Sequence, residues 1–262
     1  MLLKDKIVLI SGMGPGLGRH LALHAAREGG HLAVCARTPS KLAAIEAEVG
    51  ALGLGTRIVA VATDVADRSQ CDRFVAAALE AFGRVDVLIN SAYTAGGYAA
   101  AADADLDDWR RSLEINLFGA MNLIQQVVPA MRRQGGGSIV NVNTKVTRLP
   151  YPTLGGYAVS KAALRMATAQ LAKELGADKI RVNSVFPGWM WGPTVEAGLA
   201  AGAAGQGVTV AQMRAKIAED IPLGDIPEDA DCAKAIIALA SDYFSVVTGA
   251  CLDLSGGEYL PL

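Results

Sequence analysis

The chain has 262 residues, a formal net charge of −2 at pH 7 and a hydrophobic fraction of 52%. Nothing in this balance suggests a nucleic-acid-binding surface, and no uninterrupted apolar run reaches the roughly 20 residues of a transmembrane helix. The apolar excess is instead typical of a parallel sheet whose strands are buried on both faces.

Short apolar segments alternate with amphipathic ones along the chain. Seven short segments, most of them rich in valine or isoleucine, predict strands over Ile7–Ser11, Leu32–Ala36, Ile58–Ala62, Val85–Asn90, Ser138–Asn141, Ile180–Phe186 and Ala250–Leu254. The intervening segments predict helices over Leu17–Gly29, Pro39–Leu52, Arg68–Phe82, Leu106–Met131, Leu154–Leu175 and Glu228–Ser241. We therefore expect one α/β domain over residues 1–262, with a doubly wound, seven-stranded parallel sheet and helices on both faces.

A glycine-rich turn follows the first predicted strand and opens the first predicted helix. Its glycines, Gly12, Gly14, Gly16 and Gly18, allow a ligand to approach the backbone, and the free N–H groups of a helix N-terminus attract phosphate. The strict G-x-G-x-x-G spacing is absent, so a purely structural turn is the alternative. The position between a strand and a helix favours a pyrophosphate-binding turn.

The residues at the end of the second predicted strand indicate which dinucleotide, NAD or NADP, the chain would bind. An acidic residue there would bind the ribose 2′-hydroxyl of NAD, whereas an arginine suits the 2′-phosphate of NADP. The chain has Arg37 and Thr38 at this point and no acid. NADP is therefore favoured over NAD, although Arg37 could be only a solvent-facing cation and Pro15 stands where NADP-binding turns of this type often carry a basic residue.

Tyr157 and Lys161 lie four residues apart near the start of the helix predicted over Leu154–Leu175. This spacing places the phenol and the ammonium on one helix face. A free phenol, with a pKa of about 10, is a poor base at neutral pH, and a neighbouring ammonium lowers that pKa. The pair predicts a general acid–base catalyst, and the alternative is a solvated surface pair.

Together these motifs resemble the classical short-chain dehydrogenase/reductase family. The resemblance spans nearly the whole chain and includes, in the family's order, Ser11–Gly18, Asp64-Val65, Asn90–Tyr93, Asn116, Tyr157–Lys161 and Arg181–Gly188. It implies a Rossmann-type fold and an NAD(P)-dependent enzyme that interconverts a secondary alcohol and a ketone. It also implies a homotetramer, or failing that a dimer, in which long helices pair between subunits.

The resemblance assigns a role to each matching residue. The catalytic residues are Asn116, Thr144, Tyr157 and Lys161, where Asn116 supports the lysine through a water and the lysine also holds the nicotinamide ribose. The cofactor-binding residues are Ser11, Gly12, Gly14, Gly16, Leu17, Gly18, Arg37, Thr38, Asp64, Val65, Asn90, Ala92, Tyr157, Lys161, Pro187 and Gly188. Among them, Asp64 accepts from the adenine amino group, Asn90 lies along the ribose, and Pro187-Gly188 lies near the nicotinamide.

One position departs from the family pattern. Family members usually carry a serine thirteen residues before the tyrosine, where this chain has Thr144. Threonine keeps the hydroxyl that polarises a substrate carbonyl, but its extra methyl restricts χ1 and occupies space. The alternative function is therefore a cofactor-binding family member with little or no turnover. Asn143 is a less favoured substitute donor, and an NAD-dependent enzyme working in the oxidative direction is a further alternative.

Aromatic residues occur in loops that follow predicted strands, where ligands bind in sheets of this kind. The candidate substrate contacts are Tyr93, Tyr151, Trp189 and Trp191, which favours an apolar or aromatic small-molecule substrate, with ordinary packing as the alternative. The segment that follows is unusual, since nine of the twelve residues 196–207 are alanine or glycine. We expect a mobile substrate lid over about 192–220, because ordering such backbone costs conformational entropy.

The histidines do not indicate a metal site, and the cysteines do not indicate the disulfides of an exported protein. His20 and His24 are four residues apart but lack a third zinc ligand, so we expect no metal. The cysteines, Cys35, Cys71, Cys232 and Cys251, lack the spacing of a disulfide framework. We expect reduced thiols in a cytoplasmic protein.

Overall fold

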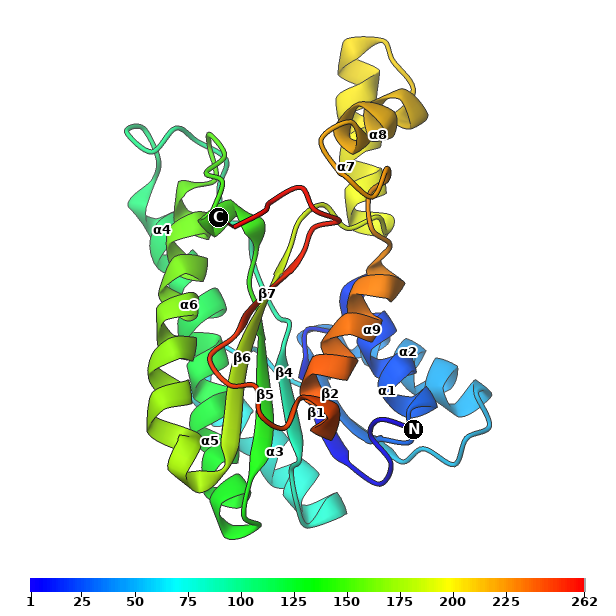
Figure 1. Ribbon diagram of the computed structural model, residues 1–262, viewed down its shortest axis with the longest axis vertical. Coiled ribbons are helices and arrows are strands. Elements are labelled where there is room, and N and C mark those ends of the chain that lie inside the picture. The colour runs from blue at the N-terminus through cyan, green and yellow to red at the C-terminus, as the bar shows by residue number, and fades with distance from the viewer. Residues whose placement is uncertain (262) are drawn as a thin grey trace.

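A seven-stranded parallel sheet lies between two layers of helices in the computed structural model, which describes residues 1–261 (Figure 1). The strands are β1 (Ile7–Ser11), β2 (His31–Ala36), β3 (Ile58–Ala62), β4 (Val87–Asn90), β5 (Gly137–Val142), β6 (Ile180–Pro187) and β7 (Cys251–Leu254), in the order β3-β2-β1-β4-β5-β6-β7. The order reverses between β1 and β4, which opens a ligand crevice at the carboxyl ends of the strands. The predicted Rossmann-type fold is confirmed.

The helices divide between the two faces of the sheet (Figure 1). One face is covered by α1 (Leu17–Arg27), α2 (Pro39–Ala51) and α9 (Asp229–Ala240). The other is covered by α3 (Arg68–Phe82), α5 (Gly119–Arg133) and α6 (Gly155–Leu175), with α4 (Leu106–Leu113) packed on α6. Short 3₁₀ turns span Lys145–Thr147, Gly176–Asp178 and Asp242–Phe244.

The strands are apolar on both faces because each face has its own helix layer to pack against. Along β1, Val8 and Ile10 belong to the core beneath α1 and α9, whereas Ile7 and Leu9 belong to the core beneath α3 and α5. Burying each such side chain contributes roughly 1.5–3 kcal/mol. This alternation fixes the register that brings the strand ends together.

The helix predicted over Leu106–Met131 is interrupted in the structure. After α4, the π-helical turn Glu114–Phe118 carries the chain into α5. A π turn inserts one extra residue into a helix, and such turns are frequent at functional sites. Here the turn contains the buried Asn116.

The segment predicted to be a mobile lid forms two helices that project beyond the carboxyl end of the sheet (Figure 1). They are α7 (Pro193–Gln206) and α8 (Val210–Ala218), which the sequence analysis did not predict. Alanine is the strongest helix former, and Thr209 with Gln212 forms a capping box on α8. Burial within α7 is limited to Leu199 and Ala203 among its described residues. Mobility and closure of this segment stay predictions.

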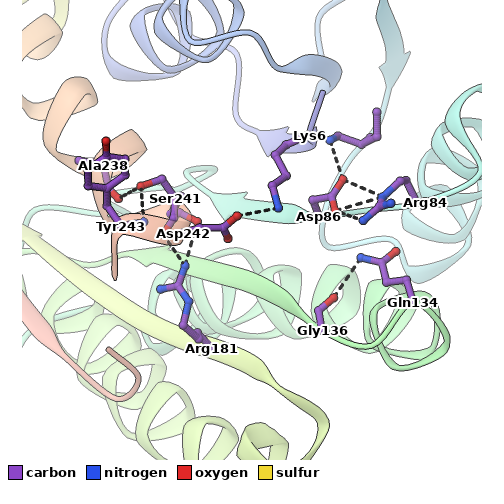
Figure 2. A network of polar contacts seen from close by, with 12 residues as sticks. Lys6, Arg84, Asp86, Gln134, Gly136, Arg181, Ala238, Ser241, Asp242 and Tyr243 are labelled. Carbon is purple, nitrogen blue, oxygen red and sulfur yellow. Dashed lines mark hydrogen bonds and ion pairs between the residues drawn. The ribbon is translucent and has the colours of Figure 1, made fainter. Parts of the chain in front are cut away.

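A polar network joins the elements at the amino ends of the strands, opposite the carboxyl ends (Figure 2). Asp86 accepts from the Ile7 N–H at 2.9 Å and pairs with the Arg84 guanidinium. Arg181 donates to the carbonyls of Ala240 and Ser241, which satisfies groups left unpaired at the end of α9. Within residues 1–261, none of the helices has the length and apolar character that a membrane crossing requires.

Candidate active site

A cavity of about 650 Å³ lies at the carboxyl ends of the strands. Its lining includes most of the predicted cofactor residues, namely Gly12, Gly14, Gly16, Leu17, Gly18, Arg37, Thr38, Asp64, Val65, Ala92, Tyr157, Lys161, Pro187 and Gly188. Thr144, Tyr93 and Trp189 line it as well. Ser11, Asn90, Asn116, Tyr151 and Trp191 lie outside this lining within the described chain.

The glycine turn fits a phosphate group because its backbone is closely packed and its helix end is open. Gly12 has φ +89°, and a Cβ there would lie 2.6 Å from the Ala92 nitrogen. A Cβ on Gly18 would collide with the Gly12 carbonyl oxygen. Gly16, the N-cap of α1, provides no capping side chain, so the first N–H groups of α1 are available to an anion.

Ser11 supports this turn from below the cavity. Its side chain is buried, and its Oγ accepts from the backbone N–H groups of Ser91 at 3.3 Å and Ala92 at 3.4 Å. It thereby ties the end of β1 to the loop after β4. The geometry indicates that Ser11 shapes the turn rather than contacting a ligand.

Two cations lie at the far end of the cavity, after β2. Arg37 and Thr38 line it, as does Lys41 in the first turn of α2, which the sequence analysis did not single out. The segment from β2 into α2 carries no acid before Glu46, so the two positive charges are not neutralised locally. Asp64 lies next to this segment, since the preceding Thr63 N–H donates to the Ala36 carbonyl at 3.0 Å, and its Oδ1 accepts from the Ala66 N–H at 3.1 Å.

Lys161 is held by the end of β5. Its ammonium is 2% exposed and donates to the Val142 carbonyl at 2.7 Å. Burial lowers the pKa of Lys161 to about 7. The lysine therefore gains or loses a proton readily near neutral pH.

The pKa of Tyr157 differs from the prediction. Burial raises this pKa well above its ordinary value of 10, and the hydrogen bond with the Thr144 side chain lowers it by a smaller amount. The predicted lowering by Lys161 is therefore wrong for this structure, because desolvation of the phenolate outweighs the effects that favour it. Tyr157 is a protonated phenol at neutral pH and is suited to donate a proton.

Thr144 presents its hydroxyl to the cavity beside Tyr157. The side chain is 7% exposed and opens the 3₁₀ turn Lys145–Thr147, where its Oγ1 accepts from the Val146 N–H at 3.3 Å. A hydroxyl has one proton to donate besides its lone pairs. Since the backbone bond uses a lone pair, the proton is available to a substrate oxygen or to Tyr157.

Asn116 joins the loop after β4 to the helix that carries Tyr157. It is 1% exposed, bonds both the N–H and the carbonyl of Thr94, and donates to Ser160 Oγ at 2.9 Å. Ser160 Oγ in turn donates to the Tyr157 carbonyl at 2.8 Å. The side-chain hydrogen bonds of Asn116 are thus with Thr94 and Ser160, and it reaches the Tyr157 backbone only through Ser160.

A buried polar chain crosses the sheet beneath the cavity. Asn90 donates to Asn141 at 2.9 Å, Asn141 donates to Thr168 at 2.9 Å, and Thr168 lies 3.0 Å from Ser184. Asn143 donates to the same Ser184 at 3.3 Å, so its amide group is already engaged. Oδ1 of Asn90 and Oδ1 of Asn143 lack a protein partner within residues 1–261, which leaves buried acceptors for a hydroxyl next to the cavity.

The aromatic residues divide between the cavity and the surrounding packing. Tyr93 and Trp189 line the cavity, and the Tyr93 ring lies 6.2 Å from that of Tyr157. The Arg214 guanidinium of α8 packs 4.1 Å from the centre of the Trp191 ring. Trp191 is therefore packed against α8. Tyr151 lies outside the cavity lining and is 42% exposed, so its substrate contact stays a prediction.

Sequence reasoning missed Asp229, which lines the cavity at the start of α9. Its carboxylate is 7% exposed, and burial raises its pKa to about 6. A Cβ on Gly16 would lie 2.5 Å from Asp229 Oδ2, so the carboxylate faces the glycine turn. An acid at a helix N-terminus is ordinary in a sequence, and nothing local indicates a contact with a turn more than two hundred residues away.

Comparisons with known proteins agree with this geometry. The short chain dehydrogenase family model matches residues 6–198. The 3-oxoacyl-(acyl-carrier-protein) reductase of Thermotoga maritima is 34% identical over 262 residues, which cover 98% of this chain and 99% of the relative. The trans-4-hydroxycyclohexanecarboxylate dehydrogenase of Sinomonas cyclohexanicum is 35% identical over 260 residues, with 97% and 93% covered.

A solved structure is similar over the whole fold. The L-sorbose reductase of Gluconobacter frateurii, in complex with NADPH and L-sorbose, superposes with a TM-score of 0.94 at 28% identity, and the match covers 99% of this chain and 98% of that one. The match to the family model spans the residues that line the cavity except Asp229, and the similarity to the relatives spans 98% of this chain. The chain therefore belongs to the short-chain dehydrogenase/reductase family of oxidoreductases.

Proposed function

We propose that the protein interconverts a secondary alcohol and a ketone with a nicotinamide cofactor, with NADP preferred over NAD. The observation that carries this proposal is the convergence of the Thr144 and Tyr157 hydroxyls at one end of the cavity, beside Lys161. Two hydroxyl groups at that point can hold one substrate oxygen. The open helix end and the two cations lie along the rest of the same cavity.

In the reductive direction, the Thr144 hydroxyl donates a hydrogen bond to the substrate carbonyl oxygen. Tyr157, kept protonated by burial, gives its proton to that oxygen as negative charge develops on it. Lys161, four residues further along α6, would stabilise the phenolate that remains whenever its side chain is protonated. A bound nicotinamide would supply the hydride in this direction and accept it in the other.

The residues that would hold the cofactor fit a dinucleotide. The N–H groups at the start of α1 would bind the pyrophosphate, and Lys161 would hold the nicotinamide ribose. Arg37 and Lys41 would bind the 2′-phosphate of NADP, since both line the cavity where an acid would be needed to favour NAD. The NADPH complex of the similar L-sorbose reductase supports this preference, whereas a relative named as an NAD(P)-dependent L-rhamnose 1-dehydrogenase supports the use of either cofactor.

The substrate would be a small molecule with an apolar or aromatic portion. Tyr93, Tyr98 and Trp189 line the cavity with Met190, and together they provide apolar surface on several sides of the reacting hydroxyls. The named substrates of the relatives include a ring carboxylate and a sugar, so carbonyl–alcohol chemistry is the property that these proteins share with the proposal.

The subunits would associate through the π turn and α6. Phe118, Val159 and Met166 expose 49%, 45% and 69% of their surface, which is unfavourable for large apolar side chains in water. These exposed residues support association between subunits, for which we propose a homotetramer, or failing that a dimer. Light scattering that reports a monomer at micromolar concentration would contradict this. We also propose a cytoplasmic location, on the basis of the unpaired cysteines.

A cofactor and substrate screen tests the proposed function. The purified protein would be mixed with NADPH or NADH and a panel of aryl and cyclic ketones, and the loss of reduced-nicotinamide absorbance would be followed. The proposal expects turnover with at least one ketone and a higher kcat/KM for NADPH. Tight cofactor binding without turnover across the panel would instead support the non-enzymatic alternative.

A further inference from the structure

Two cations in the turn after Thr144 pair with acids near the end of the chain. One acid lies in the segment that follows β7, and the other lies in β7 itself. Lys145 donates to Glu258, and these side chains are only 5% and 8% exposed. Arg148 pairs with Asp253, the other acid, which lies in β7, at 3.2 Å with exposures of 14% and 16%. Figure 1 shows the C-terminal segment crossing from β7 toward α6 at this end of the sheet. A buried ion pair thus connects the segment after β7 to the turn that begins with Thr144, and a partly buried pair without a hydrogen bond between its closest atoms connects β7 itself to that turn.

The first pair lies against the lining of the cavity. The Lys145 ammonium is 5.2 Å from the centre of the Tyr151 ring and 5.5 Å from that of Trp189. A Cβ on Gly188 would lie only 2.7 Å from Glu258 Oε2. The pair is therefore packed between the turn after β5 and the loop after β6 that holds Gly188 and Trp189.

The second pair also lies against β6 and the C-terminal segment. The Arg148 guanidinium lies 4.2 Å from the centre of the Phe186 ring and 5.0 Å from that of Tyr259. Phe186 is in β6, directly before Pro187, and Tyr259 belongs to the C-terminal segment. Arg148 thus contacts the end of β6 and the C-terminal segment at once.

The turn has few other polar ties to the rest of the fold. Its backbone bonds are local: Thr147 N–H donates to the Thr144 carbonyl, and the N–H groups of Arg148 and Leu149 donate to the Lys145 carbonyl. A buried ion pair adds little net stability because desolvation offsets its attraction, but removing one partner leaves an uncompensated charge. Such a pair therefore contributes more to holding the turn in one conformation than to the stability of the fold.

We propose that the C-terminal segment and the end of β7 position Thr144 for catalysis, the segment through the Lys145–Glu258 pair and β7 through the Arg148–Asp253 pair. Lys145 and Glu258 are positioning residues, since they act on the substrate oxygen only through the direction of the Thr144 hydroxyl. This inference rests on the proposed function. Displacement of a polar donor by about 1 Å can lower the reaction rate by as much as a hundredfold. A pair that fixes the turn can therefore matter for the rate even when it adds little to the free energy of unfolding.

A double-mutant cycle between Glu258→Gln and Thr144→Val tests the inference. Glu258→Gln should lower kcat by about ten- to a hundredfold while leaving the Kd of NADPH nearly unchanged. In the Thr144→Val background, the same substitution should have almost no further effect, because the donor it positions is already absent. Effects that multiply would overturn the inference. Asp178→Asn is the matched control. It breaks the more exposed Arg132–Asp178 pair near the amino end of β6 and should leave kcat unchanged.

Hydrogen exchange gives a readout that does not depend on turnover. Amides of residues 143–149 should exchange faster in Glu258→Gln than in the parent, and the Asp178→Asn control should match the parent. The double variant Lys145→Met with Glu258→Gln leaves no stranded charge, so it should keep the parent melting temperature and still show fast exchange. Unchanged exchange over 143–149 in both variants would overturn the positioning role. If the parent protein shows no turnover, the proposed function is refuted. The hydrogen-exchange result then tests on its own whether the ion pairs hold the turn in place.

Discussion

Replacing Thr144 by valine should remove one hydrogen-bond donor while keeping the shape of the side chain. The Thr144 proton is free to point into the cavity because its lone pair already accepts from the Val146 N–H at 3.3 Å. Loss of one donor from a preorganised site lowers kcat by about 10²–10³-fold, or roughly 2.7–4 kcal/mol of transition-state stabilisation. We expect a decrease of that size in kcat, with the KM for the cofactor little changed.

The structural cost of this substitution should be much smaller than its catalytic cost. Thr144 caps only a short 3₁₀ turn, and its 3.3 Å bond is long. Loss of a cap costs about 0.5–2 kcal/mol, which lowers the melting temperature of a chain of this size by only a few degrees, at about 2–4 °C per kcal/mol. The variant should therefore be folded under the conditions of the assay, and melting followed by circular dichroism would verify this.

The assay is the initial rate with NADPH and the best ketone from the screen, in parent, Thr144→Val and Thr144→Ser. Serine retains the donor without the extra methyl, so Thr144→Ser should retain or increase the parent rate. A Thr144→Val enzyme as fast as the parent would refute the reasoning. The donor would then lie elsewhere, although the Asn143 amide is bonded to Ser184.

Three further predictions concern the rest of the cavity. Arg37→Asp should shift the ratio of kcat/KM values from NADP toward NAD, because it replaces attraction of the 2′-phosphate by repulsion; a parent that already prefers NAD would contradict the assignment. Amides across 192–210 should become protected from hydrogen exchange when cofactor and substrate analogue are added, and unchanged protection would contradict closure of α7 and α8. The raised pKa of Asp229, about 6 against 3.8 for an unburied carboxyl, means that the folded protein loses stability as pH rises between about these values. Asp229→Asn should therefore raise the melting temperature near neutral pH and much less near pH 4, whereas Asp231→Asn on the exposed side of α9 should show no such difference.

The fold could be predicted because its signal is local. Each strand is a short apolar run and each flanking helix has its own pattern, so β1, β3 and α3 begin and end at the predicted residues. The π turn at Asn116 could not be predicted, since a helical pattern does not show where one extra residue is inserted. The helix α7 was not predicted because a run of alanine and glycine also suits a weakly packed loop, although alanine favours helix. The helix α8 has only nine residues, too few for a clear helical pattern.

The candidate site could be predicted only where a motif is contiguous or follows a strand. The glycine turn, Thr144, Tyr157 and Lys161 all line the predicted cavity. Asp229 and Glu258 depend on contacts between segments far apart in the chain, such as the Lys145–Glu258 pair across 113 positions. The direction of the Tyr157 pKa shift depends on burial, which the i, i+4 spacing with Lys161 does not reveal.

The most direct test of the account is the substitution Tyr157→Phe, which removes the transferable proton and one hydroxyl. The measurement is the single-turnover rate of ketone reduction, made together with the Kd of NADPH by fluorescence titration. The account predicts that reduction becomes undetectable while the Kd stays close to that of the parent, because the glycine turn, Arg37 and Lys161 are untouched. A Tyr157→Phe protein that reduces the ketone at the parent rate would contradict the proposed chemistry.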